Sequence, residues 1–270
     1  MIARARAILR AAPTMLRIGL ADAFAYRAEF LVWVLTTTLP LIMLALWSAA
    51  VQAGGPIGRF GQGDFVAYYL AALIVRQMTG SWVVWELNME IRQGILPMRL
   101  VRPMHPLIYY ACESLAALPL RGVIAIPVAV LLLATVGAGH VTHDPLLLAM
   151  FVVSLLGAWL LQFAVLAILG TLGMFIESSL ALFDVWLGLF SVLSGYLVPL
   201  ELFPQWVRTL VYWLPFRYIL GFPVEILTRG LSRTQALEQL GLQWGFAIMM
   251  VFFATSLWRA GLRRYQAYGG

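Results

Sequence analysis

The sequence predicts an all-α polytopic membrane protein with six transmembrane helices, an N-terminal interfacial helix and a re-entrant extracellular helix pair before the last span. Of the 270 residues, 62% are hydrophobic and 11% are charged, whereas about 25% of residues are charged in a soluble domain. Uncharged apolar runs recur along the chain, and each is long enough to cross about 30 Å of hydrocarbon. No soluble domain can be separated, so residues 1–270 are predicted to form a single transmembrane domain.

Six apolar segments are predicted to cross the membrane. The first five lie within 30–198, and the spans in order are 30–51, 65–86, 107–136, 145–170, 179–198 and 240–259. Ahead of them, residues 1–29 mix arginines with leucine and isoleucine at roughly helical spacing, which predicts an amphipathic helix lying in the cytoplasmic interface. A plain positively charged anchor is the alternative for this segment.

The orientation of the spans follows from the arginines that flank them. Five arginines precede the first span, three lie in the 87–106 loop and three lie in or beside the 260–270 tail. The positive-inside rule therefore places this loop and both termini in the cytoplasm. Against the rule, four late arginines fall outside, where long segments obey it weakly: Arg208, Arg217, Arg229 and Arg233. All 18 basic residues are arginine, which indicates a GC-rich bacterial genome. The expected location is the bacterial plasma (inner) membrane.

Several residue types are missing or scarce, and their scarcity disfavours whole classes of function. A P-loop needs a lysine that reaches the β- and γ-phosphates, and the chain has none, so we expect no bound cofactor and no nucleotide hydrolysis on this chain. The only cysteine is Cys112, which excludes an intrachain disulfide. The HVTHD stretch at 140–144 has residue types that bind zinc, but a solvated turn fits this short loop better and no metal site is predicted. Membrane orientation explains the net charge of +6 better than nucleic acid does.

The 86–106 loop is the most distinctive cytoplasmic segment. It mixes apolar residues with charges, and Gly94 and three prolines divide it into short helical turns. Apolar and ionic groups mixed in one exposed loop are typical of an interface, which predicts a docking surface for a soluble partner. An ordinary polar connector is the alternative. The candidate docking residues are Glu86, Glu90, Arg92, Gly94, Arg99 and Arg102.

Four charged residues are predicted to lie at membrane depth. Counted from the cytoplasmic boundary, Arg76 lies about 16 Å, Glu113 about 10 Å and Arg121 about 22 Å into the membrane. Asp184 lies near the cytoplasmic start of the fifth span. Intramembrane charges normally face the protein interior and pair, and their depths make Arg76 and Glu113 the predicted pair. A structural role and a contact with substrate both stay open for these residues.

The stretch 193–219 is apolar, yet three prolines and three charges interrupt it. Proline breaks a helix interior, and a continuous crossing here would leave the arginine-rich tail outside. We therefore predict that 200–227 enters from outside and leaves on the same side, as helices 204–213 and 216–227 broken at Pro215. Irregular backbone at membrane depth is tolerated where protein buries it, so this segment is predicted to be an outer plug packed against protein.

Three stretches resemble the ABC type-2 export permease family. SGYLVPLELFPQWVRTLVYWLPFRYI, followed by PVEIL and Gly230, resembles its Ser-Gly…Pro…Phe-Pro…Leu-Pro pattern. IRQGILPMRLVRPMHPLIYY looks like its Gly-x-Leu…Leu-x-Arg-Pro cytoplasmic segment, and GLRRYQAYGG is similar to the tail of one bacterial subgroup. The resemblance covers essentially the whole chain, without the large extracellular domains of some eukaryotic relatives.

This resemblance implies specific partners and roles. Two copies of a separate ATPase subunit, which bind ATP and Mg²⁺, and a second permease, identical or sister, would complete the transporter in the lipid membrane. The 86–106 loop would couple the permease to the ATPase, 1–29 would be the connecting helix, and 200–227 would close the outer end of the path. The residues assigned to this extracellular gate are Gly195, Pro199, Pro204, Pro215 and Gly221.

The function expected from these features is that of a permease subunit of an ATP-driven exporter, moving an apolar or amphipathic substrate out of a bacterial cell. Few fixed charges line the spans, which favours such a substrate. A stand-alone secondary transporter is the first alternative, and it would need a titratable carboxylate such as Glu113 or Asp184. A non-transporting scaffold protein is the second, for which the prolines of 200–227 would serve no purpose.

Overall fold

The computed structural model describes Thr14 and residues 39–102, 104–135, 137–177, 179–228 and 230–265. The chain within these ranges forms α-helices and short 3-10 turns without a β-strand, which confirms the predicted all-α class. The predicted interfacial helix at 1–29, the start of the first predicted span and the last residues of the tail lie outside the described residues.

The predicted spans coincide with helices or pairs of helices. The long elements are α3 (Leu39–Gly54), α4 (Gln62–Thr79), α5 (Val83–Arg92), α7 (Pro106–Ala116), α8 (Leu118–Thr135), α9 (Pro145–Thr171), α10 (Ser179–Leu193) and α14 (Arg233–Arg264). The short elements are α6 (Leu96–Leu100), η1 (Ala138–His140), η2 (Leu172–Met174), η3 (Leu200–Leu202), α11 (Gln205–Tyr212), α12 (Pro215–Ile219) and α13 (Gly221–Leu227). Among the described residues, Pro145–Met174 and Arg233–Arg264 are long and apolar enough to cross a membrane, while α3 and α10 are apolar but shorter. The count of six spans stays a prediction.

The second predicted span is not one helix. Gly80 leaves α4 with extended backbone (φ −60°, ψ 140°), and α5 starts after Trp82. The break exposes a carbonyl at Gly80, and the buried Arg121 of α8 donates a hydrogen bond to it. A buried donor therefore satisfies the backbone group that the break releases, as an apolar interior requires.

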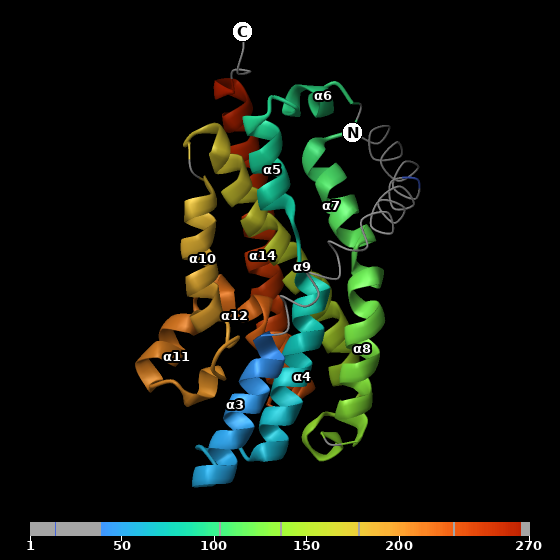
Figure 1. Ribbon diagram of the computed structural model, residues 1–270, viewed down its shortest axis with the longest axis vertical. Coiled ribbons are helices and arrows are strands. Elements are labelled where there is room, and N and C mark those ends of the chain that lie inside the picture. The colour runs from blue at the N-terminus through green and yellow to red at the C-terminus, as the bar shows by residue number, and fades with distance from the viewer. Residues whose placement is uncertain are drawn as a thin grey trace.

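The core of the bundle is built around α9, which contacts α4, α5, α10, α13 and α14 (Figure 1). Gly170 brings α9 against α5, because a Cβ at this position would lie 3.0 Å from Leu87. The buried Gln243 of α14 donates hydrogen bonds to the carbonyls of Ser154, at 3.0 Å, and Tyr218, at 2.8 Å. Small residues and side-chain amides are the groups that join helices in lipid, where helices gain nothing by hiding apolar surface.

Two ends of the bundle can be distinguished in Figure 1. The α6 end, at the top, holds α6, the start of α7 and the end of α14. The α11 end, at the bottom, holds the α3–α4 and α8–α9 loops, and α11 to α13 lie in this half. Local caps fix where helices begin: Asp144 caps α9 and Ser232 forms a capping box with Gln235 at α14.

Candidate functional site

The 194–199 connection, which joins α10 to η3, is held by aromatic side chains of α3 and α4. The hydroxyl of Tyr68 donates to the carbonyl of Gly195 at 2.7 Å, and that of Tyr69 donates to Leu197 at 2.8 Å. The indole of Trp47 donates to the same Leu197 carbonyl at 3.2 Å. The connection has no helix of its own, so these three donors fix its path and tie it to α3 and α4. The sequence alone did not predict this role for the three side chains.

The two glycines predicted to belong to the gate both permit close packing. Gly195 has φ +86°, a left-handed conformation that favours glycine, and a Cβ there would overlap the Tyr68 hydroxyl. A Cβ at Gly221 would lie 2.8 Å from the carbonyl of Ser194. The start of α13 therefore packs directly on the backbone of the 194–199 connection.

The three predicted gate prolines each stand at the start of a helix. Pro199 precedes η3, Pro204 precedes α11 and Pro215 is the first residue of α12. A proline is tolerated there because its missing N–H would be unpaired in any case. The segment differs from prediction in one respect, since 216–227 is two helices that meet at Leu220 (φ −133°, ψ −56°). The reason is Pro223, which cannot donate to the carbonyl four residues earlier.

Both ends of the 200–227 segment contact loops at the α11 end. Glu201 pairs with Arg59 in the α3–α4 loop. The carbonyl of Leu227 accepts a hydrogen bond from the N–H of Thr142, in the α8–α9 loop, at 2.8 Å. The helices between these two contacts have eight, five and seven residues, so none of them is long enough to cross a membrane.

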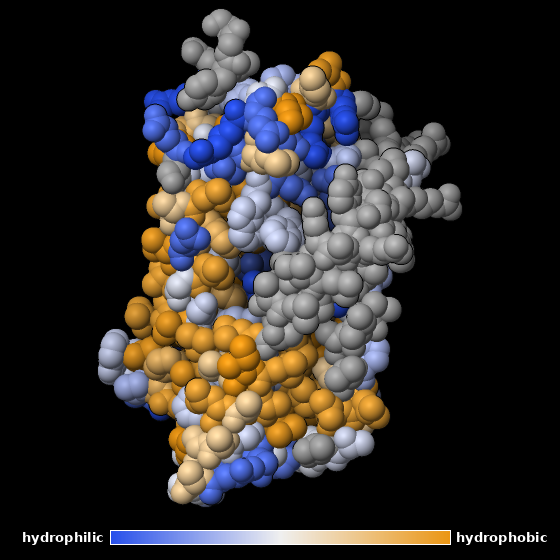
Figure 2. Space-filling model, viewed as in Figure 1, coloured by the Kyte–Doolittle hydropathy of each residue, from blue (hydrophilic) through white to orange (hydrophobic). Residues whose placement is uncertain are grey.

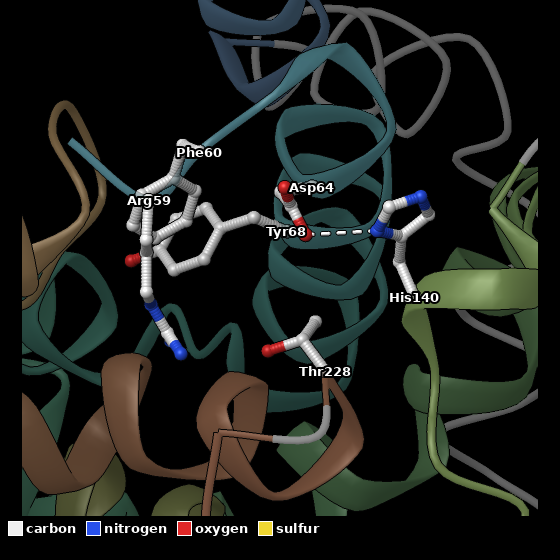
Figure 3. A pocket seen from close by; sticks show the side chains of 6 residues that line it. All are labelled: Arg59, Phe60, Asp64, Tyr68, His140 and Thr228. Atoms are coloured by element: carbon white, nitrogen blue, oxygen red, sulfur yellow. Dashed lines mark hydrogen bonds and ion pairs between the residues drawn. The ribbon is translucent and has the colours of Figure 1, made fainter. Parts of the chain in front are cut away.

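A small polar cavity of about 100 Å³ opens beside this segment (Figure 3). Its lining residues are Arg59, Phe60, Asp64, Tyr68, His140 and Thr228. His140 Nδ1 lies 2.8 Å from Asp64 Oδ1, so η1 is tied to the start of α4. The contact depends on Gly63, where a Cβ would overlap the His140 ring. A solvated turn was predicted for this loop, but His140 contacts Asp64 and the hydrogen-bonded Thr142 is buried, so the loop packs against its neighbours.

An ion pair inside the 200–227 segment joins α12 to α13. Arg217 Nη2 lies 2.5 Å from Glu225 Oε2, and both side chains are nearly buried, with 11% and 12% exposed. The guanidinium also stands over the rings of Tyr212 and Tyr218. The charge of Arg217 is therefore neutralised within the segment, which explains how an apolar stretch accommodates it.

At the α6 end, the Arg99 cluster consists of Arg99, Glu90, Glu113, Tyr109 and Tyr110. Arg99 Nε lies 2.5 Å from Glu90 Oε1 on α5, and its Nη1 lies 3.4 Å from Glu113 Oε2 on α7. The Tyr110 hydroxyl donates to Glu90 at 2.6 Å, and the guanidinium lies over both tyrosine rings. The cluster thus binds α6 to both neighbouring helices.

The predicted docking residues divide into an inward and an outward set. Glu90 and Arg99 belong to the Arg99 cluster, and Glu86 is half-buried. Arg92 and Arg102 are exposed, and Gly94 has φ +69°, which lets the chain turn from α5 to α6. The outward surface also carries apolar side chains, with Met98 70% and Val101 85% exposed.

His105 caps the helix that follows this loop. Its Nδ1 accepts a hydrogen bond from the N–H of Leu107 at 3.3 Å, at the start of α7. Its ring centroid lies 5.9 Å from that of Trp258 on α14. Burial, together with the positive charge of Arg259, lowers the pKa of His105. The neutral ring, which can accept the hydrogen bond, is therefore the favoured form.

The predicted pair of Arg76 and Glu113 is wrong. Glu113 pairs with Arg99, whereas the guanidinium carbon of Arg76 lies 5.5 Å from the ring centroid of Phe190. Depth along a helix does not say which way a side chain points, and α4 and α7 direct these two charges to different neighbours. Arg121 is buried at the α4–α5 break, as an interior charge should be.

Asp184 does not face the interior as predicted. It is exposed on α10, on a face shared with Val185, 62% exposed, and Leu189, 47% exposed. Figure 2 shows a hydrophilic spot within hydrophobic surface over α10. Among the described residues, none of the ion pairs includes Asp184.

Comparison with known proteins identifies the family. No curated protein matches the chain. The family model described as "ABC-2 family transporter protein" matches residues 31–269, nearly the whole chain. The members of this family are the transmembrane permease components of ABC transporters, work with ATPase subunits and have no catalytic activity of their own. This match shows that the chain belongs to the ABC-2 transporter family, and together with the apolar helices it shows that the chain is a membrane protein.

Proposed function

We propose that the protein is the permease subunit of an ATP-driven exporter in a bacterial plasma membrane. In this proposal the α6 end faces the cytoplasm and receives the ATPase, and the α11 end faces outward and closes the path. Two ATPase subunits bind ATP and Mg²⁺, and the substrate is apolar or amphipathic.

The observation that carries the proposal is the Arg99 cluster. α6 has only five residues, too few to hold its shape without neighbours. Arg99 joins it to α5 and α7 through Glu90 and Glu113. A force applied to the exposed surface of Met98 and Val101 is therefore transmitted to both helices, which is what a coupling helix has to do.

The α11 end has the features of a closed outer gate. The donors from Trp47, Tyr68 and Tyr69 hold the 194–199 connection, and the ion pair of Arg59 and Glu201 holds the start of the 200–227 segment. We infer that this segment is re-entrant, since both of its ends contact loops at the same end of the bundle. Opening requires the exchange of a few hydrogen bonds, not the unfolding of a helix.

The exposed carboxylate of Asp184 supports a second permease subunit. A charge on a lipid-facing helix costs up to about 3 kcal/mol at the centre of the membrane by insertion scales, and the surrounding residues of α10 are apolar. This face of α10 is better explained when another protein covers it. We propose that the partner is a second permease, identical or sister.

A coupling assay tests the proposed function. The permease is purified together with its ATPase in nanodiscs, and ATP hydrolysis and export are measured for Met98→Asp and Val101→Asp. We expect the ATPase to dissociate or to hydrolyse ATP without export, because the charge disrupts an apolar contact. Arg263→Ala is the matched control, since it is exposed at the same end on α14. Normal coupling in both α6 variants would refute the role of α6.

A further inference from the structure

Among the described residues, the cation Arg76 has no carboxylate partner. Helix geometry places it about 20 Å from the start of α4, within the last turn of the helix before the α4–α5 break. None of the ion pairs among the described residues includes it, and its Nε is buried without a hydrogen-bond partner. Its neighbours are aromatic: the guanidinium carbon lies 5.5 Å from the ring centroid of Phe190 and 5.8 Å from that of Tyr196.

A second cation, Arg121, interacts electrostatically with Arg76 and also with the carboxylate of Glu86. Arg121 is fixed in place by its hydrogen bond to the carbonyl of Gly80. Arg76 on α4 and Arg121 on α8 therefore both lie near the α4–α5 break. Arg76 is partly exposed whereas Arg121 is buried, so Arg76 is the one that a ligand can reach.

A series of aromatic rings connects this cation to two exposed tryptophans. Trp82 and Trp85 are each 37% exposed, and their ring centroids lie 4.9 Å apart. From Trp85 the ring contacts continue along α10 to the aromatic ring beneath Arg76, in the order Phe183, Trp186 and Phe190. Figure 2 shows pale and hydrophilic surface at mid-height, with hydrophobic surface beside and below it.

We propose that this place binds an amphiphile with one anionic head group, a phosphate, carboxylate or sulfonate. The head group accepts hydrogen bonds from the Arg76 guanidinium, and Arg121 adds to the positive potential. The apolar part lies on Trp82 and Trp85. Intramembrane charged residues often mark substrate and ion pathways, and charge-assisted hydrogen bonds to arginine are strong outside bulk water.

A purely structural role makes a different prediction. If Arg76 only held α4 to α10 through the rings of Phe190 and Tyr196, its replacement would lower stability and leave ligand preference unchanged. The description of the ligand as cargo depends on the proposed function. The binding itself does not, because it can be measured on the permease without its ATPase.

The test compares three amphiphiles that share one alkyl chain: dodecyl phosphate, dodecylphosphocholine and dodecyltrimethylammonium. Binding to the full-length permease in a neutral detergent is measured by native mass spectrometry. We expect the wild type to prefer dodecyl phosphate by about tenfold, and Arg76→Gln to lose this preference. Arg76→Lys should keep part of it, since lysine retains the charge without the planar fork. Arg263→Gln controls for the loss of an exposed arginine elsewhere.

A second variant keeps the proposal testable if Arg76→Gln fails to fold. The double variant Trp82→Ala and Trp85→Ala should bind all three amphiphiles more weakly by the same factor and keep the preference for phosphate. The control Phe252→Ala, on the exposed surface of α14, should change neither the affinities nor the preference. Equal affinity of the wild type for the three head groups, or an unchanged preference in Arg76→Gln, would overturn the proposal.

The source of the anionic amphiphile is decided in proteoliposomes that contain the partner ATPase. A fluorescent anionic probe that crosses the bilayer only with ATP identifies the ligand as cargo. A probe that stays bound and is displaced by phosphatidylglycerol identifies a membrane lipid. Either result supports the site. Loss of ATP coupling with binding intact would overturn the exporter role and leave this site in place.

Discussion

Arg99 on α6 pairs with Glu90 on α5, with 2.5 Å between Nε and Oε1, and only 17% and 4% of the two side chains are exposed. Tyr110 closes the pair from the side of α7 by donating its hydroxyl to Glu90. The short helix that is exposed at the end of the bundle is therefore fixed to its neighbours by a largely buried ionic contact. Its position depends on charge and geometry rather than on helix propensity.

Removal of Arg99 should destabilise the α6 end more than removal of the whole pair. Arg99→Met leaves two carboxylates near each other and should cost about 3 kcal/mol, whereas Arg99→Met with Glu90→Met should cost less than the sum of the single changes. Thermal unfolding of the four proteins in detergent measures this cycle. Additive losses would show that the pair does not position α6.

Further double-mutant cycles distinguish the observed partner of Glu113, which is Arg99, from the partner predicted by depth, which is Arg76. We expect coupling of about 1 kcal/mol between Arg99 and Glu113 and none between Arg76 and Glu113. The reason is that Glu113 contacts Arg99, whereas Arg76 contacts the rings of Phe190 and Tyr196. Coupling between Arg76 and Glu113 would require a second conformation in which α4 has rotated.

Gly195→Ala should impair export while the partner ATPase still binds ATP. The added Cβ would collide with the Tyr68 hydroxyl, and φ +86° is a strained backbone angle for alanine. The 194–199 connection therefore has to shift, at a free-energy cost of about 1–3 kcal/mol. Gly245→Ala on α14 is the matched control, because a Cβ there has nothing within 4 Å. Export assays in proteoliposomes compare the two. Wild-type export by Gly195→Ala would remove this connection from the gate.

The re-entrant path of 200–227 can be tested by thiol labelling on a Cys112→Ala background. Cysteines at Leu202 and Thr228 should both react with an impermeant reagent added outside, whereas a cysteine at Leu214 should be shielded. Cysteine at Met98 should react only from the cytoplasm, which provides the opposite control. If position 228 were labelled only from inside, the segment would be a true span and the topology would be wrong.

Acid should weaken the start of α7 through His105. Its pKa is lowered in the folded protein by burial and by Arg259, so the unfolded state binds a proton more readily. The stability that the neutral ring contributes is therefore full above about pH 6.5 and is lost as the pH falls through the lowered pKa. His105→Asn, which can still accept the Leu107 hydrogen bond, should unfold at a temperature that depends less on pH. An equal pH dependence in the two proteins would contradict this assignment.

The exposed face of α10 should lie against a second permease. A cysteine at Val185, beside Asp184, on the Cys112→Ala background should form a cross-link between permease subunits in native membranes. A cysteine at Met249, which is exposed on α14, should not. Cross-linking at Met249 and not at Val185 would place the interface on α14 instead of α10.

Several features were determined by the sequence alone, because they depend on local chemistry. The apolar composition predicted a helical membrane protein, and the family resemblance was confirmed by the match over 31–269. Proline fixes its own backbone angle and lacks a donor, so Pro204 and Pro215 marked the start of one helix and the break before the next without any tertiary information. Gly94 likewise marked the turn before α6.

Other features were decided only by the tertiary structure, because they depend on which helix faces meet. Depth along the helices favoured Arg76 as the partner of Glu113, but the fold of α6 onto α7 brings Arg99 of the cytoplasmic loop to it. The sequence does not show that Tyr68 and Tyr69 of α4 have hydrogen-bond partners. Their hydroxyls reach carbonyls of the 194–199 connection only because the fold brings the end of α10 beside α4. Ion pairs and hydrogen bonds act over a few ångströms between residues far apart in the chain, so spacing along one helix could not predict them.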